Sequence, residues 1–315
     1  MEIILMIVGL IILVKGADWL VMGASSIARK KQISNMVIGL TIVSFGTSLP
    51  ELVINLVSSF NGNTEIAIGN VVGSNIANIL LILGVSAIVY PLTIQRTTIV
   101  SEIPFSIVAA LLVGFLANAS LFSEPRMEIS SIDGFILIFF FIVFLIYIFK
   151  ISKEEIAVVS DNKVLNSKKS TLMIIGGLIG LIVGGKFTVD GAVYLAGFFG
   201  MSESFIGLTI VAIGTSLPEL FTSAVAAYRR EVDIAVGNVI GSNIFNIFWI
   251  LGLSAIIKPL PFQTTGNIDI LMIIFSSILI IVVLPLGRKG RIERWHGLVF
   301  LFCYIGYIIY LVQRG

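Results

Sequence analysis

Long apolar stretches separated by short polar segments run through the chain from one end to the other. Each is about 20 residues long or more, enough for an α-helix to cross the roughly 30 Å hydrocarbon core of a bilayer. Leucine, isoleucine, valine, phenylalanine and glycine fill them without the alternation typical of β-barrel strands. The pattern predicts ten transmembrane helices, near residues 3–28, 34–60, 64–89, 98–118, 131–150, 171–198, 204–228, 232–257, 267–287 and 293–312. We therefore expect an all-α integral membrane protein.

The two halves of the chain are copies of each other. A shift of 168 residues places Ile38–Leu92 on Ile206–Leu260 without a gap, and about 33 of these 55 positions are identical. The polar interval at 151–170 then separates an N-terminal repeat of five helices (1–150) from a C-terminal one (171–315). Because five is odd, the second copy enters the membrane from the opposite side. The duplication therefore predicts an inverted repeat.

The distribution of basic residues indicates the orientation in the membrane. Segments that follow odd-numbered spans hold 15 of the 20 lysines and arginines. Basic residues concentrate on the cytoplasmic side of membrane proteins. We expect a multi-pass protein of the cell membrane, with the 151–170 linker in the cytoplasm and both termini outside.

Composition narrows the function. Charged residues make up 12% of the chain, against about 25% in soluble domains, so the predicted environment is the lipid bilayer and no nucleic-acid partner is expected. One cysteine, Cys303, and one histidine, His296, exclude a His/Cys metal cluster. The sequence also has no HExxH motif and no credible Ser-His pair. We expect no enzyme, no cofactor and no obligatory protein partner.

The phrase GTSLPE occurs twice, starting at Gly46 and at Gly214. Proline disrupts a helix interior but fits a first turn. We therefore expect the second and seventh spans to break between Gly46 and Pro50 and between Gly214 and Pro218. In lipid, a broken helix is tolerated only where the break is buried or lines a cavity. Matching breaks in two inverted halves meet near the midplane, as in the binding sites of secondary transporters.

A glutamate follows the proline in each phrase, at Glu51 and Glu219. A buried ionised carboxylate without a partner costs about 2.5 kcal/mol or more, and neither phrase contains a basic residue. A structural kink is the simpler explanation of one break, but a kink does not need a carboxylate. The available hydroxyl and carbonyl oxygens suit Ca²⁺, Mg²⁺ or Na⁺ rather than zinc or copper. The predicted cation site adds the hydroxyl groups of Thr47, Ser48, Thr215 and Ser216.

The next span of each half repeats a second phrase, GNVVGSNIANI and GNVIGSNIFNI. Ser74 and Asn78 are four residues apart and share a helix face, as do Ser242 and Asn246. The glycines allow close helix approach, so we expect these faces to complete an oxygen cage between spans 2, 3, 7 and 8. Interhelical hydrogen bonding is the alternative role of these four residues. Packing or support of the site is expected for Asn70, Asn75, Asn238 and Asn243.

With these two pairs of phrases and its ten-span inverted layout, the chain resembles the cation/calcium exchanger superfamily in its prokaryotic sodium/calcium exchanger form. The resemblance implies that Glu51 and Glu219 hold Ca²⁺ with oxygens of Thr47 and Thr215. It implies Na⁺ sites that combine the glutamates with the hydroxyls of Ser48, Ser74, Ser216 and Ser242 and the backbone carbonyls of Ser44 and Ala212. It places Asn78 and Asn246 at the centre. Many members have an aspartate at one of these two positions, so the ion stoichiometry and any potassium dependence stay open.

Two carboxylates give a site charge of about −2, which one Ca²⁺ or two Na⁺ neutralise, so the two loads should compete. An empty charged site resists desolvation. We therefore predict a secondary antiporter that exchanges Na⁺ for Ca²⁺ by alternating access, with spans 1 and 6 gliding over the core. The alternatives are a Ca²⁺/H⁺ antiporter, against which the many hydroxyl oxygens argue, and a cation channel, against which the enclosed site argues.

Overall fold

The computed structural model describes residues 2–118, 127–154, 165–199, 212–288 and 290–314, and it is helical. Within these residues, eight helical segments are long and apolar enough to cross a membrane, and the bent pair formed by residues 35–47 and 49–61 is a ninth candidate. They agree with nine of the predicted spans to within a few residues. The span predicted at 204–228 lies partly outside the described residues, which include it only from Ala212 onward.

The helices of the two halves follow the same order. The first half contains α1 (Glu2–Lys31), α2 (Asn35–Ile38), η1 (Gly39–Val43), α3 (Ser44–Thr47), α4 (Leu49–Asn61), α5 (Thr64–Ala77), η2 (Asn78–Leu83), α6 (Gly84–Val89), η3 (Thr98–Glu102), α7 (Ile103–Asn118) and α8 (Ser131–Glu154). The second contains α9 (Ser167–Phe198), α11 (Ala212–Thr215), α12 (Leu217–Tyr228), α13 (Val232–Ile244), η5 (Phe245–Leu251), α14 (Gly252–Ile257), α15 (Gly266–Val283) and α16 (Arg294–Arg314). The η segments are π-helical.

Helix extends into both ends of the predicted 151–170 linker. α8 continues to Glu154, and α9 begins at Ser167, where the side chain of Asn166 caps it by accepting a hydrogen bond from the backbone N–H of Lys168. Lysine and glutamate are good helix formers in water, so the helices run past the end of their apolar sequence. Hydropathy alone underestimates their length.

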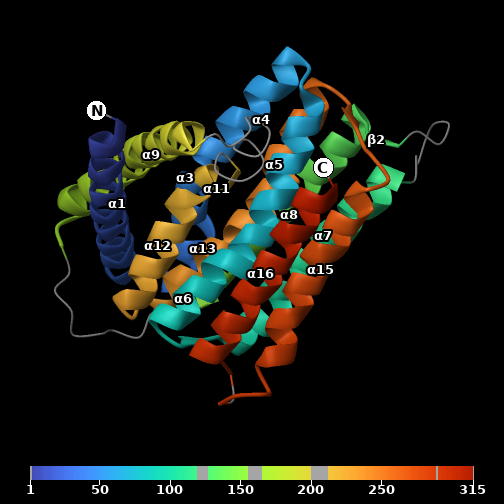
Figure 1. The fold of residues 1–315 in the computed structure, drawn as a ribbon. Helices are drawn as coiled ribbons and strands as arrows, with labels where there is room; N and C mark the ends of the chain where they lie inside the picture. The colour runs from blue at the N-terminus through green and yellow to red at the C-terminus, as the bar shows by residue number, and fades with distance from the viewer. Residues whose placement is uncertain (1, 119–126, 155–164, 200–211, 289, 315) are drawn as a thin grey trace.

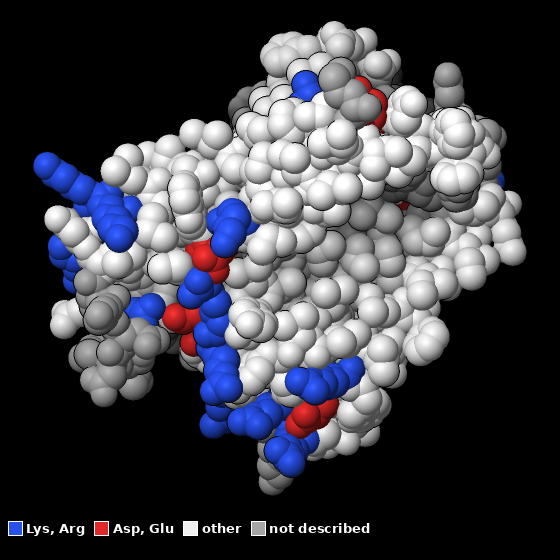
Figure 2. All heavy atoms as spheres, turned by 60° about the vertical axis from the view of Figure 1, so that its left-hand side comes forward, with Lys and Arg blue, Asp and Glu red and all other residues white. Residues whose placement is uncertain are grey.

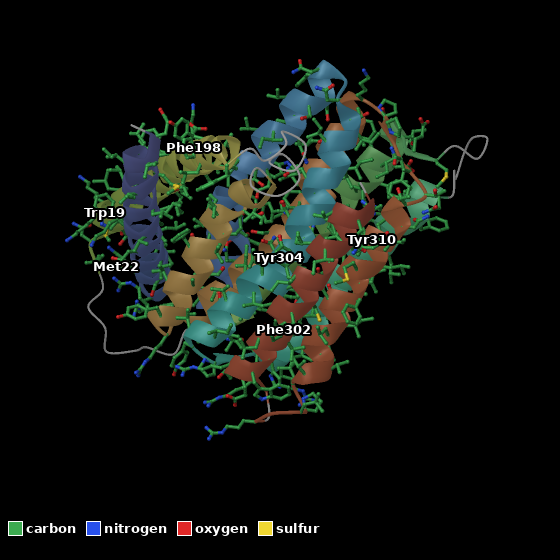
Figure 3. The ribbon with its side chains drawn as sticks, viewed as in Figure 1. Trp19, Met22, Phe198, Phe302, Tyr304 and Tyr310 are labelled. Carbon is green, nitrogen blue, oxygen red and sulfur yellow. The ribbon has the colours of Figure 1, made fainter. Side chains whose placement is uncertain are left out.

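The spans α5–α6 and α13–α14 form the centre of the protein. In each, 78% of the most apolar 18-residue window is buried, against 28% in α1, α8 and α16. The outer helices expose large apolar side chains, including Trp19, Phe198 and Phe302 (Figure 3). An apolar surface of this kind fits a lipid environment and not water. The chain is therefore an α-helical, multi-pass membrane protein with a polar-lined centre.

Helices α1 and α9 run antiparallel, side by side, at one edge of the molecule (Figure 1). Glycines line their contact. A Cβ on Gly16 would lie 2.9 Å from the carbonyl oxygen of Gly177 and 2.9 Å from the backbone nitrogen of Leu181, and one on Gly184 would lie 2.8 Å from the carbonyl oxygen of Gly9. The two backbones therefore touch directly, which joins α1 and α9 into one unit.

Two short antiparallel sheets connect the halves. β1 (Leu92–Thr93) pairs with β4 (Arg291–Ile292), and β2 (Glu128–Ile129) pairs with β3 (Leu260–Pro261). Each sheet joins one strand of the first half to one of the second, and β1 and β3 occupy equivalent positions of the repeat. Strands of two residues are too short to produce a period in the sequence, so the sequence does not predict them.

Charged residues gather on one part of the face shown in Figure 2. Lysines and arginines lie mostly over its left and lower parts, and most of the rest of this face is uncharged. In the turn between α12 and α13, Glu231 accepts hydrogen bonds from Ser25 Oγ (2.8 Å) and Asn35 Nδ2 (2.7 Å) and pairs with Arg29 Nη2 (3.2 Å). These bonds tie the C-terminal end of α1 to the α12–α13 turn.

Candidate functional site

Both GTSLPE phrases break their helix, as predicted. Helix α3 ends at Thr47 and α4 begins at Leu49, with a bend of 47° between the two parts of the span. The residue at the break, Ser48, has φ −81° and ψ 8°, and Ser216 at the second break has φ −88° and ψ 7°. Proline occupies the first turn of α4 and of α12. The two copies of the phrase therefore fold alike.

Each break holds the glutamate of the opposite half. Ser48 Oγ donates a hydrogen bond to Glu219 Oε1 at 2.9 Å, and Ser216 Oγ donates one to Glu51 Oε1 at 3.2 Å. Both glutamates are only 1% exposed. Residues about 168 positions apart thus form one site, with one carboxylate from each copy.

The site contains acceptor oxygens that no protein donor reaches. Among the described residues, Glu51 Oε2, Glu219 Oε2, Asn78 Oδ1 and Asn246 Oδ1 are buried without a hydrogen-bond partner. The three ion pairs found among the described residues all involve carboxylates other than Glu51 and Glu219. Buried acceptors are normally satisfied, and oxygens alone are the ligand set of hard cations. The arrangement can bind Ca²⁺ or Na⁺ directly.

The predicted hydroxyl groups lie around these oxygens. Thr47, Ser48, Ser74, Ser216 and Ser242 are all buried. Ser216 Oγ lies 3.3 Å from Ser74 Oγ, and Ser242 Oγ has no partner among the described residues. Thr215 is 8% exposed.

The two predicted carbonyl ligands differ in what the structure describes. The carbonyl oxygen of Ser44 accepts hydrogen bonds from Ser48 N (3.0 Å) and Thr47 Oγ1 (3.3 Å) at the first break. Ala212 begins α11, and none of the contacts described for the chain reaches its carbonyl oxygen. The structure therefore places Ser44 at the first break, whereas the role of Ala212 rests on the family resemblance.

Residues that the sequence analysis missed or assigned to packing surround the threonines. Thr47 Oγ1 donates to Asn238 Oδ1 (3.0 Å), whose amide nitrogen donates to Ser223 Oγ (2.9 Å). In the other half, Thr215 Oγ1 contacts Asn70 Oδ1 at 3.4 Å, and Asn70 Nδ2 donates to Asn55 Oδ1 at 3.1 Å. Ser223 and Asn55 each follow a site glutamate by four residues, so they share its helix face. This spacing is the signal that could have identified them.

Both central asparagines lie in π-helical turns. The segment η2 begins at Asn78, and η5 includes Asn246. A π-helical turn inserts an extra residue into an α-helix and is frequent at functional sites. Asn78 and Asn246 occupy equivalent positions of the repeat, so the two halves use the same local geometry here.

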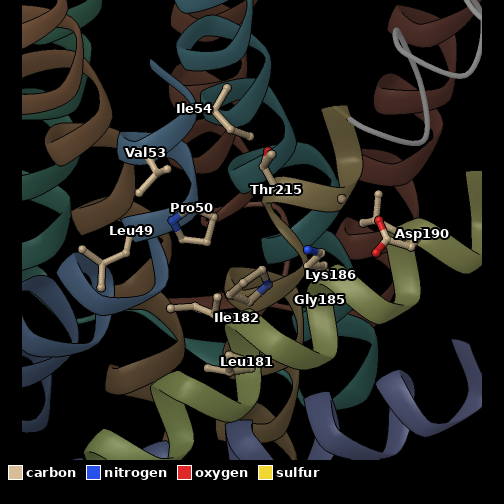
Figure 4. Close-up of a pocket in the computed structure, with 13 residues that line it drawn as sticks. Leu49, Pro50, Val53, Ile54, Leu181, Ile182, Gly185, Lys186, Asp190 and Thr215 are labelled. Atoms are coloured by element: carbon tan, nitrogen blue, oxygen red, sulfur yellow. The ribbon is translucent and has the colours of Figure 1, made fainter. Parts of the chain in front are cut away.

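A largely apolar cavity of about 340 Å³ reaches the site from the side of α9 (Figure 4). Its wall includes residues from the first turns of α4 and α12, and Thr215 belongs both to the cavity and to the predicted site. Lys186 and Asp190 are the charged residues of its lining. The cavity therefore borders the break in the second half.

Helix α9 also contacts both breaks. A Cβ on Gly46 would lie 2.4 Å from Leu178 Cδ2, and one on Gly214 would lie 2.3 Å from Val189 Cγ2. A side chain at either glycine would therefore force Leu178 or Val189 of α9 to shift. Any displacement of α9 changes the packing at each break.

The chain matches known proteins along almost all of its length. The family model described as "Sodium/calcium exchanger protein" matches residues 1–150 and 169–313. The putative antiporter CaxA of Alkalimonas amylolytica is 40% identical over 313 residues, covering 96% of both chains. The sodium/calcium exchanger MaX1 of Methanosarcina acetivorans is 33% identical, covering 98% of this chain and 97% of that one.

Solved structures give the same result. A structure of the sodium-calcium exchanger NCX_Mj soaked with Na⁺ and Ca²⁺ superposes on this chain with a TM-score of 0.81 at 36% sequence identity. The match covers 98% of this chain and 97% of that chain. At this identity the similarity extends beyond the fold, and it includes the segments that carry both pairs of phrases.

Proposed function

The chain belongs to the sodium/calcium exchanger protein family and is a transporter that exchanges Na⁺ for Ca²⁺, not an enzyme; from this premise we propose that exchange proceeds by alternating access at the site around Glu51 and Glu219. The observation that carries the proposal is the group of four buried, unpartnered oxygens supplied equally by the two halves. A cation bound among them satisfies all four, and its release leaves them unsatisfied.

The two loads share the glutamates. Ca²⁺ takes six to eight oxygen ligands at about 2.3–2.6 Å. The two carboxylates supply the anionic part of that shell, and Thr47 and Thr215 add neutral oxygens. Na⁺ ions use the same carboxylates with further oxygens, which come from Ser48, Ser74, Ser216, Ser242 and the carbonyls of Ser44 and Ala212. Asn78 and Asn246 complete the centre. Because both loads need the same two charges, they compete.

We also propose that the halves 1–150 and 171–315 form an inverted repeat of ten spans, joined by the cytoplasmic 151–170 linker, with both termini outside. The equivalent breaks at Ser48 and Ser216 support this arrangement. The two sheets support it as well, because exchanging the halves converts the β1–β4 sheet into the β2–β3 sheet.

Cysteine labelling tests the inverted repeat. Phe60 and Tyr228 occupy equivalent positions in the two copies and are 72% and 79% exposed. In a Cys303→Ser background, a membrane-impermeant maleimide is expected to label Phe60→Cys on intact cells and Tyr228→Cys only after permeabilisation. Labelling of both from the same side would contradict the inverted repeat.

The packing of α1 and α9 supports the proposal of alternating access. Their glycine-lined contact makes them one unit, and α9 passes over both breaks. We propose that this unit glides over the core and opens the site to one side at a time. An empty site with two buried charges opposes occlusion, since desolvating unpaired carboxylates is costly. Only a loaded site therefore crosses between the two states, which makes exchange obligatory.

Reconstitution tests the proposed function. Proteoliposomes loaded with Na⁺ and diluted into Na⁺-free buffer are expected to accumulate Ca²⁺, and uptake should stop when internal Na⁺ is replaced by K⁺. Equal uptake driven by a proton gradient alone would identify a Ca²⁺/H⁺ antiporter. Unsaturable Ca²⁺ flux without a counter-ion would identify a channel.

A further inference from the structure

Three buried groups form a hydrogen-bonded chain behind Thr47. The amide nitrogen of Asn238 donates to Ser223 Oγ at 2.9 Å and to the carbonyl oxygen of Glu219 at 3.4 Å. On its other side, Asn238 Oδ1 accepts a hydrogen bond from Thr47 Oγ1 at 3.0 Å. Asn238 and Ser223 are fully buried, and Thr47 is 1% exposed. These three side chains are therefore shielded from bulk water.

The donors and acceptors in this series of hydrogen bonds are fixed. A backbone carbonyl can only accept a hydrogen bond, so the carbonyl of Glu219 requires the amide nitrogen of Asn238 on its side. The oxygen of Asn238 must then face Thr47. A hydroxyl has one hydrogen, and Thr47 turns it toward two acceptors: Asn238 Oδ1 at 3.0 Å and, at the longer distance of 3.3 Å, the carbonyl oxygen of Ser44. What remains on Thr47 Oγ1 is lone pairs, which can coordinate a cation.

A second chain of the same kind ends at Asn78. The carbonyl oxygen of Asn75 accepts from Asn243 Nδ2 at 3.3 Å, and Asn243 Oδ1 accepts from Asn78 Nδ2 at 2.9 Å. Here too a backbone carbonyl fixes the orientation of the first amide, which fixes the second. Asn78 Oδ1 is left buried and without a partner among the described residues. It is held as an acceptor for the ion.

We propose that Asn238 and Asn243 are positioning residues for cation binding. Each donates a hydrogen bond from its NH₂ group to a backbone carbonyl, and this bond fixes the orientation of its amide. The amide oxygen then orients Thr47 or Asn78 of the opposite half so that an oxygen of that residue faces the ion. The proposal rests on the proposed function, because it assumes that the cation binds at this site. In this proposal α13 does more than supply ligands: its two asparagines keep N–H and O–H groups pointed away from the bound ion.

The repeat provides a matched control. Asn75 is the counterpart of Asn243 in the first half, but its amide nitrogen donates to the carbonyl oxygen of Val71 in its own helix at 2.7 Å. Its Oδ1 has no partner among the described residues, so its side chain does not orient Asn246. The hydrogen-bonded series that orients Asn78 therefore has no counterpart that orients Asn246 through Asn75. Substitution of the two equivalent asparagines should have different effects.

Equilibrium binding of radioactive Ca²⁺ to the purified full-length protein in detergent tests the proposal. Asn243→Leu is expected to weaken Ca²⁺ binding about 10- to 100-fold, the usual effect of losing a group that orients a metal ligand, and Asn75→Leu is expected to change it little. Because Asn243 acts through Asn78, adding Asn243→Leu to Asn78→Ala should cause no further loss. Additive losses would show that Asn243 does not act through Asn78.

A second, independent pair keeps the test valid if Asn243→Leu fails to fold. Asn238→Leu and Thr47→Val are expected to weaken binding to similar extents, and the double variant should match the singles. Additive losses in both pairs, or wild-type affinity of Asn243→Leu and Asn238→Leu, would overturn the proposal. Wild type and Glu51→Gln are measured in parallel. If wild type does not bind Ca²⁺, or if Glu51→Gln still binds it, the proposed site is wrong. If wild type binds Ca²⁺ and Glu51→Gln does not, a failed test concerns only the role of the asparagines.

Discussion

Glu51→Gln and Glu219→Gln are each expected to reduce Na⁺-driven Ca²⁺ uptake by about 30-fold or more, because losing one member of a buried charge pair costs about 2–5 kcal/mol. Glutamine keeps the oxygen that accepts from the opposite serine, so the fold of the break is preserved. What it removes is half of the negative charge that balances Ca²⁺. The measurement is the initial rate of uptake into Na⁺-loaded proteoliposomes, with Ca²⁺ binding measured on the same preparation.

Glu231→Gln provides the control for these substitutions. Glu231 is a partly buried glutamate with hydrogen bonds from Ser25 and Asn35, and it lies at the α12–α13 turn, away from the helix breaks. It undergoes the same chemical change, and we expect its uptake to stay close to that of the wild type. Wild-type uptake by either site variant would show that the repeated phrase does not form the transport site.

Gly16→Leu is expected to separate binding from transport. Its Cβ would meet the backbone of Gly177 and Leu181 at 2.9 Å, and backbone atoms cannot move aside as a flexible side chain can. Overpacking of this kind typically costs about 1–3 kcal/mol, so α1 and α9 should no longer move as one unit. Uptake should fall about tenfold or more, at about 1.4 kcal/mol per tenfold change, whereas Ca²⁺ binding persists because no described hydrogen bond of the site comes from α1.

Gly306→Leu is the matched control, since nothing lies within 4 Å of the Cβ that it would add in α16. Its uptake and binding should both match the wild type. If Gly16→Leu transported normally, the unit formed by α1 and α9 would have no part in alternating access. If it lost binding and uptake together, the α1–α9 contact would support the site itself rather than the motion.

Much of the architecture follows from the sequence because the duplication applies the same constraint twice. Hydropathy gives the spans, and proline at positions 50 and 218 gives the breaks, since its geometry excludes it from a helix interior. The pairing of hydroxyl and carboxylate does not follow. Ser48 is three residues from Glu51 along the chain, but its hydroxyl donates to Glu219, and only the packing of the two halves determines which glutamate it reaches.

The amide orientations could not be predicted for a similar reason. Asn75 and Asn243 occupy equivalent positions in nearly identical phrases, yet one donates within its own helix and the other donates across to the opposite half. Equal sequences therefore do not imply equal hydrogen bonds, because the neighbours differ at Asn55 and Ser223, at Ala77 and Phe245, and elsewhere in the halves. The sequence predicts which residues gather at the site, and the structure gives the direction of their hydrogen bonds.

The exchange of serines between the two glutamates also has a consequence for biosynthesis. Glu51 accepts its hydrogen bond from Ser216, which is synthesised 165 residues later. Glu219 accepts its hydrogen bond from Ser48, which is already in the membrane when Glu219 is synthesised. While the first half is alone in the membrane, its carboxylate has no such partner. The newly made N-terminal half is therefore incomplete as a folding unit, and the site closes only when the second half has been translated and has packed against the first.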